Sequence, residues 1–273
     1  MTVTTKGRVQ PHNERAAAVW SAGGHDYDRI SRGIADAIEH CALRLNPQPG
    51  ERILDLSTGT GWTSRIVARS GARVTGVDIA GVLLDVARAR AAAEALPIDY
   101  QVADAEELPF ETGAFDAVVS TFGVMFASRP EAAAAELARV CKKGGRVALV
   151  TWAPDSTVLR MFQVMRRYMP PPPSPAPPSP FDWGRTERIR ELLGSAFELH
   201  FETGVSYYRE PSAAAAWDTF SSGYGPTRTL AASLDPGRRE ALREDFTALH
   251  AEFLTELGIC VPREYLLAIG ARV

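Results

Sequence analysis

Three aspartates stand at the ends of short apolar segments typical of buried strands. Asp55 lies within 53–56, Asp78 follows 74–77, and Asp104 follows 100–103. In an open α/β sheet, ligands bind at the carboxyl ends of the strands, so carboxylates at successive strand ends gather at one site. A carboxylate accepts hydrogen bonds from neighbouring hydroxyls and attracts a positive charge. The pattern therefore predicts a ligand that carries a sugar diol and a cationic group.

The turn after Asp55 contains two glycines, in the run Ser57-Thr58-Gly59-Thr60-Gly61-Trp62. Glycine has no Cβ, so the backbone can turn sharply there and approach a ligand closely. A dinucleotide-binding turn requires G-x-G-x-x-G and a P-loop requires GK[ST], and neither pattern is completed here. Asp55 would also repel a pyrophosphate, which places a nicotinamide-dependent oxidoreductase last among the candidates. A sulfonium or ammonium fits better, and the acids together with the glycines point to S-adenosylmethionine.

The other two acids have distinct expected partners in such a nucleoside. Asp78 lies on the side of the sheet expected for pairing with the ribose hydroxyls. The carboxylate of Asp104 can accept a hydrogen bond from the adenine amino group, while the amide of Ala105 serves a ring nitrogen. One such acid alone would be weak evidence for this interpretation, but three acids at three successive strand ends favour it.

These residues require an alternating framework of strands and helices to bring them together. We expect strands at 53–56, 73–77, 98–103, 115–121 and 146–152, with helices at 63–70, 82–95 and 131–141. The strands are continuous apolar runs, as expected when helices cover both faces of a parallel sheet. This half of the chain therefore predicts a parallel sheet with right-handed crossovers.

The flanking regions differ in character. Residues 1–15 are polar and unpatterned and predict a loose arm, and 16–45 have helical periodicity. Beyond Trp152, the proline-rich run 169–180 predicts an extended surface connector, with a PxxP-type ligand as the alternative. A strand at 197–209, helices at 212–220 and 236–257, and a final strand at 262–273 are expected to follow.

Composition excludes several classes of protein. The chain has 273 residues and a formal net charge of -3, which argues against general affinity for nucleic acid. The three cysteines are isolated and the five histidines are scattered without ligand spacing, so we expect neither a disulfide framework nor a metal site. No segment has the pattern of a secretory signal or the roughly 20 apolar residues needed to span a bilayer. We expect a cytoplasmic protein.

The motifs together resemble those of the class I S-adenosylmethionine-dependent methyltransferases, in their type 11, UbiE-like branch. The resemblance covers about 27–152. It rests on the glycine turn at 53–61, on Gly76-Val77-Asp78-Ile79, on the segment 103–110, and on the runs 115–120 and 142–147. One position departs from the pattern, because Ser57 stands where the family usually has glycine. A residue with a Cβ needs a permissive backbone conformation, so we expect a slightly wider turn.

The resemblance implies a fold and a domain organisation. The fold class is α/β, with a Rossmann-like seven-stranded, mostly parallel sheet, helices on both faces, and a helical, aromatic-rich cap inserted in the C-terminal half. Residues 1–45 would form an N-terminal helical lid and 46–152 the S-adenosylmethionine-binding core. Residues 153–258 would form the cap or substrate region with strand six, including the linker 169–180. Residues 259–273 would supply the final strand of the core sheet.

The resemblance also implies S-adenosyl-L-methionine as methyl donor and S-adenosyl-L-homocysteine as product. The methionyl end would lie near the first turn, the nucleoside near the next two strand ends, and the sulfonium near the end of strand four. Tyr27 resembles the family's lid aromatic. The implied cofactor-binding residues are Tyr27, Asp55, Ser57, Thr58, Gly59, Gly61, Asp78, Ile79, Leu83, Asp104, Ala105, Thr121 and Phe122.

Methyl transfer from a sulfonium is an in-line displacement that depends mainly on orientation and desolvation. A base is needed only when the acceptor must lose a proton, and His25, near the expected lid, is the leading candidate for a catalytic residue. The region 153–258 is rich in aromatic residues, which suits an apolar or aromatic small-molecule acceptor, methylated on O, N or C.

Two alternatives stay open. The acceptor could instead be tRNA or protein, or the chain could be a non-catalytic S-adenosylmethionine-binding module. Neither the identity of the acceptor nor the oligomeric state follows from the sequence.

Overall fold

The computed structural model describes residues 7–174 and 176–273, and its strands form one twisted sheet. The strand order is β3-β2-β1-β4-β5-β8-β6, and β7 pairs with β8 off this path. The strands are β1 (Arg52–Leu56), β2 (Arg73–Asp78), β3 (Asp99–Val102), β4 (Phe115–Thr121), β5 (Cys141–Trp152), β6 (Phe197–Glu210), β7 (Leu254–Thr255) and β8 (Gly258–Arg272).

Strands β1 to β5 pair in parallel, whereas β8 is antiparallel to both β5 and β6. The seven strands along this path confirm the predicted seven-stranded, mostly parallel α/β sheet. Strand β1 lies near the middle of the sheet, and its last four residues are buried. Both faces of these strands are covered, which explains why their sequences are apolar runs rather than alternating patterns.

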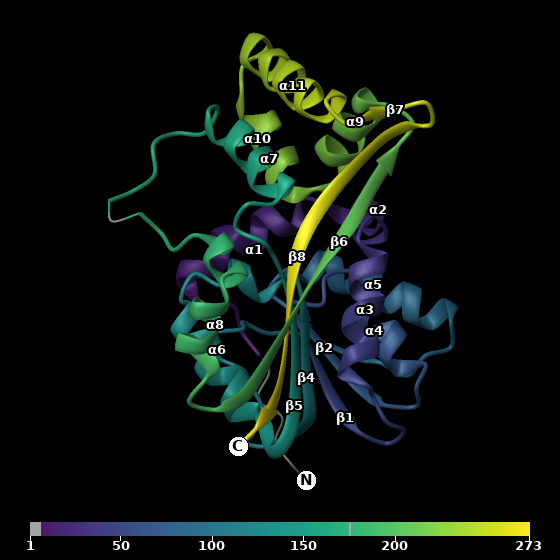
Figure 1. Ribbon diagram of the computed structural model, residues 1–273, viewed down its shortest axis with the longest axis vertical. Coiled ribbons are helices and arrows are strands. Elements are labelled where there is room, and N and C mark those ends of the chain that lie inside the picture. Colours follow the sequence, from purple (N-terminus) through teal and green to yellow (C-terminus); the bar gives the residue numbers. More distant parts are fainter. Residues whose placement is uncertain (1–6, 175) are drawn as a thin grey trace.

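Helices cover both faces of the sheet (Figure 1). Figure 1 shows α3 (Ala35–Leu45), α4 (Trp62–Ala68) and α5 (Gly81–Ala93) on one side, and α6 (Pro130–Val140) and α8 (Thr186–Leu193) on the other. Because β1, β2 and β4 are parallel, the turns that follow their carboxyl ends lie at the same end of the molecule.

A helical layer caps that end of the sheet. It contains α1 (Glu14–Ser21), α2 (Tyr27–Arg32), α7 (Thr157–Arg166), α9 (Ala213–Gly223), α10 (Gly225–Ser233) and α11 (Pro236–Ala251). The long strands β6 and β8 run from the sheet into this layer, where α9 and α11 pack together (Figure 1). Because the two strands belong to both layers, they fix the cap relative to the sheet.

Several boundaries in the cap differ from those expected. Helix α11 ends at Ala251 rather than near 257, and β8 begins at Gly258 rather than at 262. Gly258 has φ of 108°, which favours glycine, and this allows the tight β7–β8 hairpin that ends the helical run. Helices α7, α8 and α10 were not expected. The described part of the proline-rich run leads into the 3₁₀ helix η4 (Pro180–Gly184) and has no other regular structure.

The expected loose N-terminal arm was wrong for residues 7–15. This segment includes the 3₁₀ helix η1 (Pro11–Asn13) and packs against the end of β3. The amide of Gln10 and the side-chain nitrogen of Asn13 both donate to Asp104 Oδ2, at 3.0 and 2.9 Å. His12 Nε2 lies 2.6 Å from a Glu106 oxygen. Polar contacts hold this segment in place, so its packing could not be predicted from an apolar pattern in the sequence.

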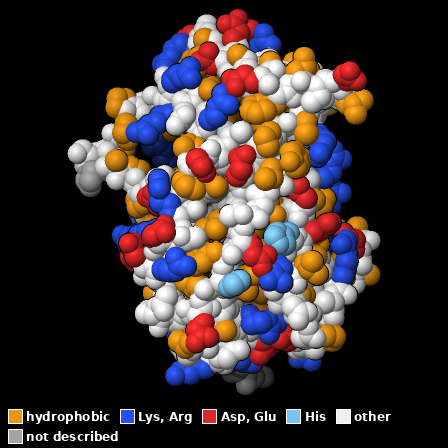
Figure 2. Space-filling model, in the orientation of Figure 1, with side chains coloured by type: hydrophobic (Ala, Val, Ile, Leu, Met, Phe, Trp, Pro, Cys, Tyr) orange, Lys and Arg blue, Asp and Glu red, His pale blue; other side chains and the backbone are white. Residues whose placement is uncertain are grey.

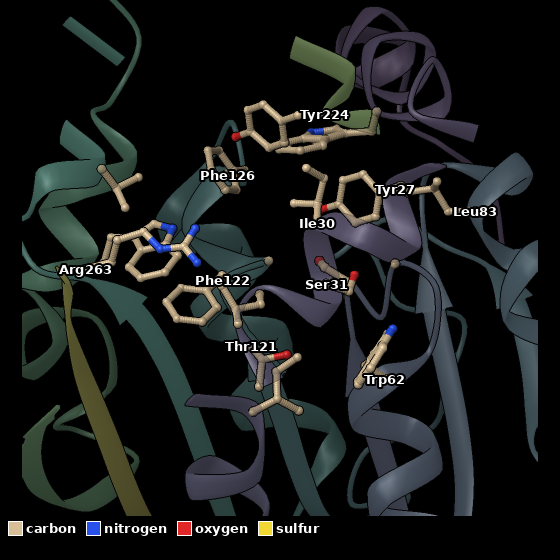
Figure 3. Close-up of a pocket in the computed structure, with 18 of the residues that line it drawn as sticks. Tyr27, Ile30, Ser31, Trp62, Leu83, Thr121, Phe122, Phe126, Tyr224 and Arg263 are labelled. Carbon is tan, nitrogen blue, oxygen red and sulfur yellow. The ribbon is translucent and has the colours of Figure 1, made fainter. Parts of the chain in front are cut away.

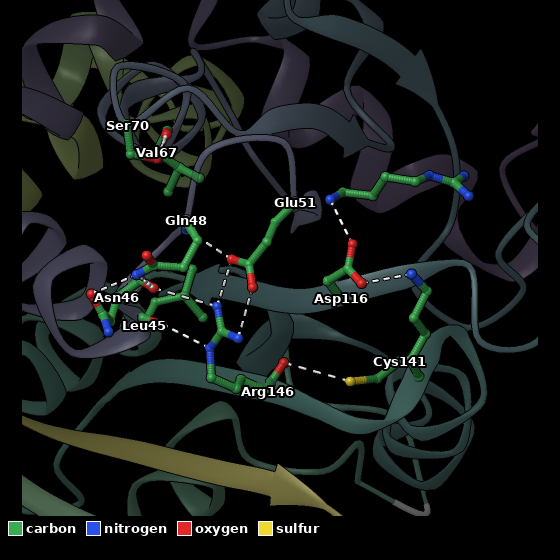
Figure 4. Close-up of polar contacts among 11 residues, drawn as sticks. Leu45, Asn46, Gln48, Glu51, Val67, Ser70, Asp116, Cys141 and Arg146 are labelled. Carbon is green, nitrogen blue, oxygen red and sulfur yellow. Dashed lines mark hydrogen bonds and ion pairs between the residues drawn. The ribbon is translucent and has the colours of Figure 1, made fainter.

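Ion pairs fix the opposite ends of the strands, away from the cap (Figure 4). Arg146 bonds both Glu51 oxygens, at 2.9 and 2.7 Å, and this hydrogen bonding holds the pKa of Glu51 below its usual value. Asp116 accepts from the amide of Arg52 at 2.8 Å and from Lys142 Nζ at 2.6 Å. These contacts tie the starts of β1, β4 and β5 together.

Candidate functional site

A large cavity lies between the carboxyl ends of the strands and the helical cap (Figure 3). It contains about 1500 Å³ of empty space, including its mouth. The turns after β1, β2, β3 and β4 form one wall. Residues of α1 and α2 also line the cavity, and α7, α9, α11, β6 and β8 supply the cap wall. Figure 3 shows Arg263 and Phe122 on one side of the cavity and Tyr27 and Leu83 on the other.

Most of the residues predicted to hold the cofactor line this cavity. They are Tyr27, Ser57, Thr58, Gly59, Asp78, Ile79, Leu83, Asp104, Ala105, Thr121 and Phe122. Asp55, Gly61 and the candidate base His25 are not part of the lining. The sheet thus brings together three strand ends that are separated by 20 residues or more in the sequence, as parallel topology requires.

The first turn uses backbone conformations that favour glycine. Ser57, Gly59 and Gly61 have φ of 58°, 56° and 77°. Ser57 adopts the left-handed conformation despite its Cβ. A Cβ added at Gly123 would lie only 2.3 Å from Ser57 Cβ. Glycine at 123 thus leaves the space that the Ser57 side chain occupies.

Gly61 has a structural reason to be glycine. A Cβ at this position would lie 2.3 Å from Tyr100 Oη and 3.1 Å from Ala87 Cβ. The residue also begins α4 as its N-cap. Gly59, by contrast, would bring its Cβ only into ordinary contact with Tyr27, at 3.4 Å. Of the two glycines, only Gly59 presents its backbone to the cavity.

Asp55 supports the turn from behind. Its side chain is buried, and Oδ2 accepts hydrogen bonds from Thr58 Oγ1 at 2.5 Å and Ser64 Oγ at 2.6 Å. Burial raises the pKa of Asp55 to about 6. Its Oδ1 has no hydrogen-bond partner among the described residues. The carboxylate that was expected to attract a cationic ligand therefore does not line the cavity. It stabilises the turn that does.

Asp78 faces the cavity from the end of β2. Its two oxygens accept from the amides of Gly59 and Ala80, each at 2.8 Å. Burial raises the pKa of this carboxyl above its usual value. The bond to Gly59 joins the first turn to the second strand end, so the two elements form one polar surface. Carboxylate oxygens have lone pairs for further donors, such as ribose hydroxyls.

Asp104 also lines the cavity, but its carboxylate accepts hydrogen bonds from other groups of the protein. Besides Gln10 and Asn13, its carboxylate accepts from the amide of Glu106 at 3.1 Å. Asn13 lines the cavity beside it. The N-terminal segment thus helps to form the site at the place where the sequence predicts the adenine edge, a contribution that sequence reasoning missed.

The end of β4 carries a strained aromatic residue. Phe122 has φ of 58°, which is unusual for a bulky side chain, and strained residues of this kind cluster at functional sites. Its ring stacks on that of Trp152, with centroids 3.8 Å apart. Thr121 shares a 2.6 Å hydrogen bond with Thr63. The expected sulfonium-facing residues therefore form a rigid, largely apolar wall.

The two candidates from the N-terminal helices have different surroundings. Tyr27 lies over Gly59, and burial together with the charge of Asp78 raises the pKa of its hydroxyl. Its ring contacts Trp20 edge to face. His25 lies in the exposed 3₁₀ helix η2 (Gly24–Asp26) and does not face the cavity.

Two polar residues of the cap wall were missed by sequence reasoning. His250, in α11, is 4% exposed, and its Nδ1 lies 2.8 Å from the Phe246 carbonyl. A carbonyl only accepts, so Nδ1 carries the proton and Nε2 keeps its lone pair. Burial lowers the pKa of the imidazole, which favours this neutral form. Arg263, in β8, is 7% exposed and lines the same wall.

The sequence contains a weak signal for each of these two residues. Arg263 and Glu264 interrupt the otherwise apolar run 259–269, where charged residues are unexpected in a strand covered on both faces. His250 lies four residues after Phe246 on the apolar face of its helix. Neither pattern indicates the cavity without the fold.

The donor wall fits an adenosylated sulfonium. It offers two buried carboxylates at neighbouring strand ends, a glycine backbone without a side chain, and an apolar surface from Ile79, Leu83 and Ala105. Among residues 7–174 and 176–273, no group of three or more His, Cys, Asp or Glu side chains could hold a metal ion. In the same residues, no helix is both long and apolar enough to span a membrane.

Comparisons with known proteins agree with this site. A model of a methyltransferase domain matches residues 54–149. An uncharacterised protein of Mycobacterium tuberculosis is 37% identical over 273 residues, covering 98% of each chain. A demethylmenaquinone methyltransferase of Clavibacter sepedonicus is 38% identical over 127 residues, 46% of this chain and 51% of the relative.

A solved structure shows the same fold. It is a phosphoethanolamine N-methyltransferase of Haemonchus contortus in complex with phosphomonomethylethanolamine and S-adenosylhomocysteine, with a TM-score of 0.54 and 18% identity. The match covers 86% of this chain and 52% of that chain. The domain match, the Clavibacter relative and the donor wall lead to one conclusion: this chain belongs to the class I S-adenosylmethionine-dependent methyltransferases, and S-adenosylmethionine is its methyl donor.

Proposed function

We propose that this methyltransferase acts on a small organic acceptor with an apolar or aromatic body, methylated on O, N or C. The observation that carries the proposal is the continuity of the cavity. The strand-end residues that fit the donor share one space with aromatic and apolar side chains of the cap, including Trp152, Phe220 and Tyr224. Such a lining, with few polar groups, is typical of small-molecule sites. The name of the Clavibacter relative agrees with a small acceptor.

The surface does not favour a nucleic-acid acceptor. Figure 2 shows acidic and basic side chains intermingled over the face in view, without a stripe of one sign. The net charge of -3 is also opposite to the basic footprint expected of a tRNA-binding enzyme. A protein or tRNA acceptor and a non-catalytic binding module remain the competing functions.

The roles of the residues follow from their positions. When bound, S-adenosylmethionine supplies a methyl group on a cationic sulfur that leaves as a neutral thioether. Asp78 and Asp104 would bind the nucleoside, and Gly59 would leave room for the methionyl end. The Phe122–Trp152 pair would exclude water from the line of transfer, which favours displacement. His250 Nε2 is the accessible base of the acceptor wall and replaces His25 as the candidate proton acceptor.

We also propose that the regions work as a lid, core and cap. Residues 1–45 would cover the donor, 46–152 would bind it, and 153–258 would bind the acceptor. Residues 259–273 would complete the sheet.

Formation of S-adenosylhomocysteine in separated cell fractions tests the proposal. The protein is incubated with S-adenosylmethionine and one of three fractions: small molecules, total RNA or total protein. We expect product with the small-molecule fraction, and much less product at the same S-adenosylmethionine concentration with Asp78→Asn, because that variant binds the donor more weakly. Turnover that requires RNA or protein would show that the acceptor is a macromolecule and not a small molecule. Donor binding without turnover in any fraction would favour the binding module.

A further inference from the structure

Arg263 is a buried cation on the acceptor wall. Its guanidinium carbon lies 4.7 Å from the centre of the Tyr208 ring and 5.5 Å from that of Trp152. One terminal nitrogen donates to the carbonyl of Gly33. Its Nε is buried and has no hydrogen-bond partner among the described residues. Figure 3 shows the residue on the Phe122 side of the cavity, away from the donor wall near Tyr27 and Leu83.

In the described part of the chain, no carboxylate pairs with this charge. Within 7–174 and 176–273, no acidic side chain lies within ion-pair distance of Arg263. Asp36 contributes a more distant charge, but its oxygens accept from Ser206 Oγ at 2.6 Å and the amide of Tyr207 at 3.2 Å. Glu210 accepts from Tyr208 and Thr219.

The guanidinium nevertheless stays charged at neutral pH. Burial lowers the pKa of Arg263, but only to about 10. Its neighbours on the cavity side, Trp152, Tyr208 and neutral His250, carry no negative charge. A buried charge without a partner is costly, so proteins that retain one usually pair it with a ligand or another charge. Since Arg263 lines the cavity, a ligand bound there could supply the missing counter-charge.

We propose that Arg263 is the counter-ion of the acceptor, which therefore presents an ionised acidic oxygen, a carboxylate or an acidic hydroxyl, on its apolar or aromatic body. This rests on the proposed function, since it assumes that a small acceptor fills the cap side of the cavity. One terminal nitrogen of Arg263 is taken by the Gly33 carbonyl, and the other, which has no hydrogen-bond partner among the described residues, supplies donors in the planar geometry that suits such an oxygen. Nε2 of His250, which only accepts, suits an O–H or N–H elsewhere on the same molecule.

Binding of two matched probes to the S-adenosylhomocysteine complex tests this role. The probes are 2-naphthoate and its uncharged analogue 2-naphthamide, measured by isothermal titration calorimetry. We expect the wild type to bind the carboxylate at least about tenfold more tightly, because a charge-assisted hydrogen bond contributes that much. Arg263→Met should reduce the preference to within about twofold, since it keeps only the aliphatic stem.

The matched control is Arg209→Met. Arg209 also stacks on a tyrosine, with its guanidinium 5.2 Å from the Tyr207 ring, but it is exposed and does not line the cavity. This variant should keep the full preference. Arg263→Lys, which keeps the charge, should keep part of it. Equal S-adenosylhomocysteine affinity in all variants shows that the donor wall is intact.

Three results would overturn the role of Arg263. They are equal or no binding of the probes by the wild type, a preference that survives in Arg263→Met, and equal losses in the lysine and methionine variants. In each case S-adenosylhomocysteine binding and small-molecule turnover would stand. Turnover that requires RNA or protein would instead overturn the proposed function, whatever the probes show.

Discussion

Gly123→Ala should destabilise the protein, and Ser57→Gly should relieve much of that loss. The two residues meet where the turns after β1 and β4 touch. The new methyl at 123 would lie 2.3 Å from Ser57 Cβ, 2.9 Å from the Ser57 carbonyl oxygen and 3.2 Å from Oγ. Gly123 itself has φ of -92°, which alanine adopts without strain. The cost of the substitution is therefore contact with Ser57 rather than backbone conformation.

The size of the effect follows from these contacts. Overpacking of this kind costs about 1–3 kcal/mol, and Gly123→Ala should lie in the upper part of that range. Ser57→Gly removes a left-handed strain of about 1–2 kcal/mol but adds unfolded-state entropy worth about 0.4–1 kcal/mol, so alone it should change little. In the double variant only the carbonyl contact remains. We expect a coupling of about 1–2 kcal/mol.

Urea unfolding of the four proteins measures this coupling. The control is Gly81→Ala, whose Cβ would meet only Val102 Cγ2 at an ordinary 3.6 Å. Alanine is the better helix former, so this control should be neutral or slightly stabilising. If the effects of Gly123→Ala and Ser57→Gly add to within about 0.5 kcal/mol, Ser57 Cβ is not what requires glycine at 123, and the account of this turn is wrong.

Three further substitutions test the donor wall and the residues that support it from behind. Gly61→Ala should cost about 2–3 kcal/mol in thermal unfolding, and less in a Tyr100→Phe background, because the new Cβ meets Tyr100 Oη and φ is 77°. Asp78→Asn should weaken S-adenosylmethionine binding in calorimetry by about tenfold to a hundredfold, whereas exposed Asp85→Asn should leave it unchanged. The pKa of Asp55 is raised to about 6, so the folded state binds this proton more tightly than the unfolded state does. Its contribution is complete in acid and is lost as pH rises, and the urea midpoint of the wild type should fall relative to that of Asp55→Asn between about pH 4 and pH 6. A difference between the two midpoints that stays constant over this pH range would contradict the raised pKa of Asp55.

The parallel half of the fold could be predicted because its signals are local. Strands such as Arg52–Leu56 and Phe115–Thr121 are apolar runs bounded by turn residues, and each is followed by a helix. Alternation then restricts the topology to a parallel sheet. The later elements were harder. Helix α8 has only two buried residues, Ile189 and Leu193, and the end of α11 depends on a hairpin at Gly258 rather than on periodicity.

The donor wall was predictable for a related reason. Each strand end contributes a short motif that carries its own chemistry, so Asp78 and Gly59 could be singled out before their 2.8 Å contact was known. The same reasoning placed Asp55 in the site, whereas it lies behind the turn. Spacing shows that a carboxylate stands at a strand end, but not which face of the turn it reaches.

The acceptor wall has no such motif, and this determines what a single sequence can reveal. Trp152, Tyr208, His250 and Arg263 come from β5, β6, α11 and β8, and more than a hundred residues separate the first from the last. Each alone is an ordinary aromatic, histidine or arginine. Their chemical meaning arises only when antiparallel β8 is inserted between β5 and β6, because this pairing stacks the guanidinium against two rings and buries it without a counter-charge. The residues that fit the donor thus belong to contiguous motifs, whereas the proposed acceptor site forms only through the order of strands at one edge of the sheet.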